Sequence, residues 1–230
     1  MRRRVAACAG AAAAAVLALA ACGPTTPEAP PGPGPTQHFV NAPAFARAPT
    51  LAQRYVDFSF DYPGSWSADA DNGAPTAEDF VRFVRQDRSG VTLESFGVGS
   101  YRTTGDAGVD RAQAPALLTN MERQVNTLPG YRRVSLGEAT TVDGLPGTQL
   151  TFSATPQVNG KTLTEFGRLI LVPGPAGQHN GVALILLGAD ASGELHSVAD
   201  LGVKGQMPVI LNSFRFGVPA NGGATNGAGR

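Results

Sequence analysis

The histidines of this chain, His38, His179 and His196, are side chains of the type most often used for acid–base catalysis and metal binding. No two of them have the spacing of a zinc site. The segment Asp69-Ala70-Asp71-Asn72-Gly73 has part of the pattern of a calcium-binding loop. Its glycine falls one place early and no downstream glutamate fits, which favours a solvated turn. The sequence therefore predicts no metal site and no bound cofactor.

Candidate nucleophiles and phosphate-binding loops give equally little support to catalysis. No serine lies in a Gly-x-Ser-x-Gly motif, and neither Ser65 nor Ser95 has a histidine–aspartate partnership that the sequence assigns. Gly97-Val98-Gly99 lacks the third glycine and the following helix of a dinucleotide site. No Gly-x-x-x-x-Gly-Lys motif is present. We therefore predict a protein without enzymatic activity, and an unrecognised hydrolase is the least favoured alternative.

Cys22 is the residue whose surroundings predict a definite chemical modification. Arginines at positions 2–4 precede an apolar segment from Val5 to Ala21, which is typical of a secretory signal peptide. The last residues, Leu19-Ala20-Ala21-Cys22, resemble a bacterial lipobox. In precursors of that kind the cysteine thiol takes a diacylglycerol and the chain is cut just before it. The alternative is an ordinary signal peptide in which Cys22 is incidental.

Lipidation at Cys22 would decide where the protein is located. Acyl chains hold a protein to a bilayer by burying methylene groups, at ~0.8 kcal/mol each. The sequence therefore predicts an extracytoplasmic protein that is anchored to the membrane through the lipid on Cys22. Gly23 follows the cysteine where some Gram-negative lipoproteins carry a retention aspartate, so a Gram-negative host would place the protein at the outer membrane. Cys8 would leave with the signal, so the mature domain has no thiol chemistry.

The charge balance argues against nucleic-acid binding. The full chain has 18 basic and 18 acidic residues, and loss of the signal arginines leaves 15 basic residues. A mature chain with a net charge of about −3 has no basic excess with which to neutralise phosphates.

Composition predicts four segments along the chain. Residues 1–21 form the lipoprotein signal peptide, and residues 22–48 contain the lipidated Cys22 and a spacer rich in proline and glycine. Residues 49–216 form a single globular domain, which is long enough for one core. Residues 217–230 form a flexible tail of Gly, Ala and Asn.

Hydrophobic periodicity predicts an α+β fold, a largely antiparallel sheet with helices packed on it. The best helix is 114–128, with Pro115 in its first turn and an apolar stripe, and a weaker helix lies within 193–212. An Asn-Gly pair at 159–160 predicts a hairpin turn. The expected strands cover residues 56–62, 79–86, 91–98, 131–136, 148–154, 162–172, 182–187 and 214–216.

Two groups of residues carry a resemblance to a known family. They are Phe60, Tyr62, Pro63 and Trp66 in "FSFDYPGSW", and Gly144, Pro146 and Gly147 in "VDGLPGTQL". Together with the closing "ILNSFRF", these motifs resemble the PsbP-like domain, which includes the LpqN group of bacterial lipoproteins. The resemblance implies an α/β/α sandwich and a protein that binds other proteins. It supplies no catalytic residues, and Tyr62 and Trp66 are expected to pack in the core or at a strand corner.

These observations leave two main functional hypotheses. The first is a membrane-anchored envelope lipoprotein whose domain is a non-enzymatic protein-binding or accessory module, with an envelope protein as partner. The second is a carrier of a small apolar molecule or lipid in a pocket between the helix at 114–128 and the sheet. Charges near that helix, from Glu122 and Arg123 to Arg132 and Arg133, are either the rim of a partner site or a solvated surface. The loop Pro173–Gly181 is either a binding tip or a connector.

Overall fold

The computed structural model describes residues 32–41, 54–68, 79–175 and 179–217, and the side chains of 79 and 80 are not included. The signal peptide, Cys22 with its lipobox, the Asp69–Gly73 segment and the C-terminal tail lie outside the described residues. The predictions made for them therefore stay predictions.

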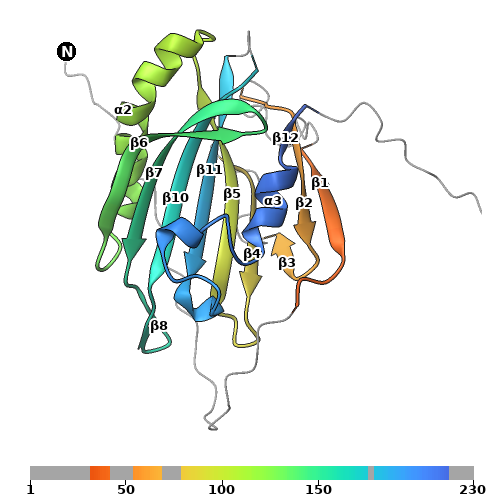
Figure 1. The fold of residues 1–230 in the computed structure, drawn as a ribbon, viewed down its shortest axis with the longest axis vertical. Helices are drawn as coiled ribbons and strands as arrows, with labels where there is room; N and C mark the ends of the chain where they lie inside the picture. The colour runs from red at the N-terminus through yellow and green to blue at the C-terminus, as the bar shows by residue number, and fades with distance from the viewer. Residues whose placement is uncertain (1–31, 42–53, 69–78, 176–178, 218–230) are drawn as a thin grey trace, which may run out of the picture.

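A seven-stranded sheet forms the centre of the fold, with the strand order β3-β4-β5-β11-β10-β7-β6 (Figure 1). Every neighbouring pair in it is antiparallel. The strands are β3 (Trp66–Ala68), β4 (Asp79–Gln86), β5 (Thr92–Arg102), β6 (Arg132–Val142), β7 (Leu145–Ala154), β10 (Glu165–Pro173) and β11 (Asn180–Ala189). The expected hairpin is also present, with β8 (Gln157–Val158) and β9 (Lys161–Thr162) joined through Asn159 and Gly160.

A smaller sheet combines β1 (Thr36–Val40), β2 (Phe58–Pro63) and β12 (Arg215–Phe216) in the order β1-β2-β12. The sequence placed Thr36–Val40 in the spacer of residues 22–48, and this assignment needs correction. The segment pairs with β2 along its whole length, and Phe39 stacks on Phe60 with ring centroids 5.1 Å apart. The folded part therefore begins before residue 49.

Helix α2 (Ala107–Val125) begins seven residues earlier than the sequence predicted. Its N-terminus is set by Asp106, whose side chain accepts from the backbone N–H groups of Gly108 and Val109. Pro115 consequently lies inside the helix, and its placement in the first turn was wrong. The described residues contain no helix that is both long enough and apolar enough to cross a membrane.

The second predicted helix is much shorter than the range 193–212. Two 3₁₀ turns, at Asp190–Ser192 and Val198–Asp200, precede the helix α3 (Met207–Ser213). Gly202 and Gly205, between the second turn and α3, have φ values of +84° and +71°. These left-handed conformations cannot continue a helix, so the chain turns there instead.

The layers confirm the α+β prediction. Helix α2 packs on one face of the large sheet, mainly against β7, β6 and β10, and the small sheet and α3 cover the other face (Figure 1). Each face has its own apolar core. The core between the sheets is dominated by phenylalanine rings, with Phe58, Phe60, Phe96 and Phe214 completely buried. The helix-side core contains the apolar stripe of α2, with Leu118 fully buried.

Candidate binding cleft

The aromatic residues Phe60, Tyr62 and Trp66 of the "FSFDYPGSW" segment are packing residues. Phe60 is fully buried, and Trp66 is 3% exposed with its indole N–H donating to Gln206 Oε1 over 3.1 Å. Tyr62 is half-buried against the same core and its hydroxyl donates to Gln37 Oε1. Pro63 ends β2 and pairs with the first residue of β1. These contacts position the small sheet over the large one.

The second motif forms the turn between β6 and β7. Asp143 and Gly144 have φ values of +50° and +74°, which are the left-handed conformations of an Asp-Gly hairpin turn. Gly147 lies so close to β10 that a Cβ at this position would approach Leu171 O to 3.0 Å. Pro146 is exposed beside it. Together they shape a tight hairpin, whose first residues on the β7 side border a cleft.

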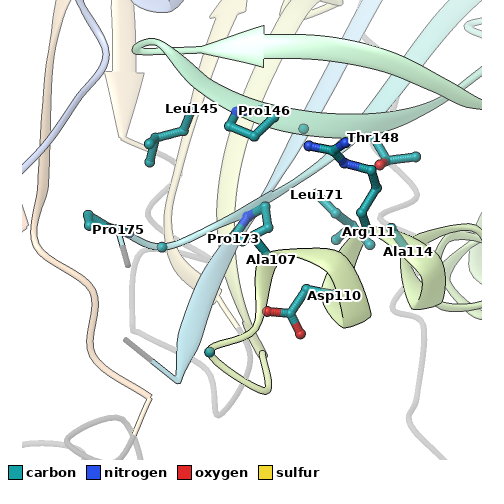
Figure 2. A pocket seen from close by; sticks show the side chains of 13 residues that line it. Ala107, Asp110, Arg111, Ala114, Leu145, Pro146, Thr148, Leu171, Pro173 and Pro175 are labelled. Atoms are coloured by element: carbon teal, nitrogen blue, oxygen red, sulfur yellow. The ribbon is translucent and has the colours of Figure 1, made fainter. Parts of the chain in front are cut away.

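This cleft, of about 220 Å³, lies between the start of α2, the start of β7 and the end of β10 (Figure 2). Most of the side chains that line the cleft are apolar and small. Pro146 faces Pro173 across the cleft, and Leu145, Ala107 and Leu171 contribute further apolar surface. The complete lining is Gly105, Ala107, Asp110, Arg111, Ala114, Leu145, Pro146, Gly147, Thr148, Leu171, Pro173, Gly174 and Pro175.

The first turn of α2 is held in place by hydrogen bonds between Asp110 and the preceding loop at Thr104. Asp110 is buried, and its Oδ1 accepts from both the backbone N–H and the hydroxyl of Thr104 over 2.7 and 2.8 Å. His179 approaches the same loop, with Nδ1 3.1 Å from Thr104 O. Burial, reinforced by the charge of Asp110, raises the pKa of Tyr101 above its ordinary value, so this hydroxyl stays neutral. These contacts join the start of α2 to the loop at Thr104.

Arg111 is the one cation among the lining residues. It is exposed and reaches from α2 toward Thr148 of β7 (Figure 2). Within the described part of the chain it has no ion pair or side-chain hydrogen bond. The mouth of an apolar cleft thus presents an unpaired guanidinium to solvent.

Glu122, considered above as a rim or surface charge, is neither. It is 4% exposed and accepts from the hydroxyl of Tyr131 and from Arg133 Nε, the latter over 2.7 Å. Arg133 holds the pKa of the Glu122 carboxyl below its usual value. Arg123 and Arg132 are exposed and lie outside the cleft. This ion pair joins α2 to β6 and is part of the scaffold.

The histidines are not brought together. His38 Nδ1 lies 2.6 Å from Asp61 Oδ1 on the surface of the small sheet, His179 contacts the Thr104 loop, and His196 is exposed near the 3₁₀ turns. No group of three potential metal ligands occurs among the described residues. The serines considered as nucleophiles make other contacts, since Ser65 donates to Gln206 Oε1 and Ser95 Oγ accepts from Arg82 Nε.

Glu94, a buried acid, makes contacts that are structural. Glu94 is completely buried, and burial raises its pKa. Its oxygens lie 3.3 Å from the backbone nitrogens of Gln206 and Met207, at the start of α3. Arg85 Nε is 2.8 Å from Glu94 Oε2, although its N–H is not directed along that line, and Arg85 Nη2 donates to Glu194. The perturbed pKa therefore belongs to a group that fixes α3 on the sheet.

Comparisons with known proteins give a weak structural likeness. No family model and no curated protein matches the sequence. The structure of LpqN, described as involved in cell envelope biogenesis of Mycobacterium tuberculosis, matches with a TM-score of 0.45 and 15% identity over 80% of this chain and 92% of that one. The Ran-binding protein Mog1p of Saccharomyces cerevisiae matches with a TM-score of 0.42 and 13% identity, covering 69% and 89%. At these similarities the matches carry no functional argument.

Proposed function

We propose that this chain is a membrane-anchored envelope lipoprotein whose domain is a non-enzymatic protein-binding module. The observation that carries the proposal is the cleft beside the first turn of α2. It is apolar, it lies at loop ends on a rigid sheet, and it has a free arginine at its mouth. Loops held by a rigid scaffold are where recognition sites are most often found.

The size of the cleft favours a protein partner over a carried molecule. Pockets for small molecules usually measure roughly 300–1,000 Å³, and this cleft measures about 220 Å³. That volume suits one or two side chains of a partner, in the manner of an anchor residue seated at the centre of an interface. Arg111 at the mouth favours a partner that has a carboxylate next to its apolar anchor.

The carrier hypothesis remains the second candidate because of where the cleft lies. A pocket between the helix and the sheet is what a carrier of a small apolar molecule requires, and the cleft lies between α2 and the strands β7 and β10. The two proposals differ in what should occupy the purified protein. A carrier retains an extractable apolar molecule, whereas a binding module does not.

The anchor is proposed from the sequence. Residues 1–21 would be removed, Cys22 would receive the lipid, and the spacer that follows would hold the domain away from an extracytoplasmic membrane surface. This membrane is the outer one if the host is Gram-negative. Labelling cells with radioactive palmitate tests the proposal directly. Incorporation should be seen for the wild-type chain and lost in Cys22→Ser, and normal processing of that variant would contradict the anchor.

Site-specific photo-crosslinking in living cells tests the binding module. A photoreactive amino acid at Pro175, a partly exposed lining residue that leaves Arg111 in place, should crosslink the lipoprotein to one dominant envelope protein, and the same group at Arg123, exposed on α2 outside the cleft, should not. Ala107→Phe should remove the crosslink because the added ring fills the cleft from its exposed edge. Gln113→Phe, exposed on the same helix away from the cleft, should leave it intact. Equal crosslinking from both positions would contradict the proposal.

A further inference from the structure

A second cavity lies on the other side of the β6–β7 hairpin, between its turn, β10 and α3. Its volume is about 530 Å³ and its lining is mainly polar, unlike that of the cleft. Ile170 and Leu211 provide an apolar patch, and the ionisable residues of the lining are Arg168, Arg215 and Asp143. A volume of this size falls within the range of sites for small molecules.

Arg168 is the unusual member of this lining. It projects from β10, near the middle of the large sheet, and is half-buried on the same face as Ile170. Its Nε donates to Gln149 Oε1 over 2.7 Å and its Nη2 to Thr140 Oγ1 over 2.9 Å. Both acceptors are uncharged. Two such bonds fix the orientation of the guanidinium plane, and neither acceptor carries a charge that would neutralise it.

The third nitrogen of the Arg168 guanidinium is Nη1. This atom donates to no atom of the described residues. It lies beside Gly202, where a Cβ would come within 3.4 Å of it, so the absence of a side chain there keeps Nη1 open to the cavity. A half-buried guanidinium with free N–H groups is a preorganised partner for a planar oxyanion.

The carboxylates nearest to Arg168 have hydrogen-bond partners of their own. Glu138 Oε2 accepts from Gln149 Nε2 and from Ser135, so a neutral amide separates it from Arg168. Asp143 accepts from the backbone N–H of Phe216, and its Oδ1 lies 3.6 Å from Arg215 Nε. Burial lowers the pKa of Arg168, and the charge of Glu138 acts in the opposite direction.

We propose that this cavity binds a small organic carboxylate, with the carboxylate oxygens paired to Arg168 and the apolar part of the ligand lying against Ile170 and Leu211. The charge of the lining selects this class. Among the lining residues, Arg168 and Arg215 against Asp143 give a net charge of +1, which a single carboxylate neutralises and a phosphate dianion exceeds. This proposal rests on other residues than the protein-binding proposal, because no residue lines both hollows.

Nuclear magnetic resonance of the full chain carrying Cys22→Ser provides the test, with Gly144 and Gly202 as reporters that line the cavity. Sodium butyrate should shift both amide signals saturably with a Kd of about 1–10 mM, and sodium chloride at equal ionic strength should not. Absence of saturable shifts in this otherwise unchanged chain would overturn the proposal. Inorganic phosphate that shifts the same signals at lower concentration would overturn the assignment to a carboxylate.

Variants locate the binding group. Arg168→Gln should weaken butyrate binding by at least about tenfold. Arg82→Gln removes another half-buried arginine, one that does not line the cavity, and should leave the affinity unchanged. Asn212→Glu places a competing carboxylate at an exposed position of the lining and should also weaken binding, whereas Asn212→Gln should not. Butyrate binding at wild-type affinity in both Arg168→Gln and Asn212→Glu would overturn the proposal. If Arg168→Gln does not fold, wild-type affinity in Asn212→Glu alone would overturn it.

Discussion

Replacing Glu122 by Gln tests whether the ion pair between α2 and β6 stabilises the fold. The carboxylate of Glu122 accepts from Arg133 through Nε and Nη2 and from the hydroxyl of Tyr131. Glutamine has nearly the same volume but carries no charge, and its amide group presents donors to a guanidinium that is itself only a donor. The substitution therefore removes the charge-assisted bonds and leaves the packing of α2 in place.

The expected loss is about 2 kcal/mol at neutral pH. Hydrogen bonds to charged groups contribute ~1.5–3 kcal/mol, and breaking a fully buried ion pair costs ~3–5 kcal/mol. Glu122 is buried, but the Arg133 side chain is 47% exposed and can be rehydrated, so the lower part of these ranges applies. For a domain of this size, about 2 kcal/mol corresponds to a fall in Tm of roughly 4–8 °C.

The pH dependence separates this ion pair from a packing effect. The pKa of Glu122 in the folded state is lowered from 4.5, mainly by its hydrogen bond with Arg133. Its contribution to stability is therefore present above the unfolded pKa and declines as the pH falls through the lower folded value. Urea denaturation at pH 7 and at successively lower pH should show the gap between wild type and Glu122→Gln narrowing below about pH 4.5.

A matched control is available on β6, the strand that carries Arg133. Glu138 is exposed and accepts only from neutral side chains, so Glu138→Gln should change the free energy of unfolding by less than about 0.5 kcal/mol. Our assignment of Glu122 would be refuted by a Glu122→Gln protein as stable as wild type at pH 7. A gap that stays constant down to pH 3 would also refute it.

Four further substitutions, one of them a control, test the contacts that hold the fold together. Trp66→Ala should lower the free energy of unfolding by ~3–5 kcal/mol, because it empties a core site, and an unchanged Tm would place Trp66 on a functional surface. Gly167→Ala should cost ~1–3 kcal/mol, since its Cβ would lie 2.0 Å from Phe152 Cζ, whereas Gly97→Ala should be well tolerated at 3.7 Å from its nearest neighbour. Asp106→Ala should cost about 1 kcal/mol through loss of the α2 N-cap, measured by thermal denaturation, and no loss would mean that the cap is redundant.

Local patterns in the sequence predicted the large sheet well. The range 79–86 matches β4 completely, and the Asn-Gly pair at 159–160 forms the predicted turn. Both signals depend on neighbours in sequence, alternation in one case and turn chemistry in the other. The start of α2 was missed because its first turns carry little apolar surface and Pro115 was read as a start signal. Asp106, a good N-cap residue, was the signal that could have corrected this.

The other features that the sequence did not predict arise from contacts between distant segments. Strand β1 exists because β2 pairs with it, and the adjoining proline-rich composition concealed five residues of ordinary strand character. The cleft is assembled from residues around 105–114, 145–148 and 171–175, none of which carries a recognisable binding motif. The Arg168 cavity depends on β10 and on a glycine 34 positions later. Sequence periodicity does not show which distant segments of the chain come into contact.

The turn between β6 and β7 connects the two proposals physically. Pro146 and Gly147 line the cleft, whereas Asp143 and Gly144 line the cavity, so one hairpin turn is a wall of both hollows. Gly147 also packs against Ile170, which is part of the cavity lining. A substitution in this turn would therefore disturb both sites at once and could not assign a function to either. Arg111 and Arg168 each line only one of them, which makes these two arginines the informative positions for experiment.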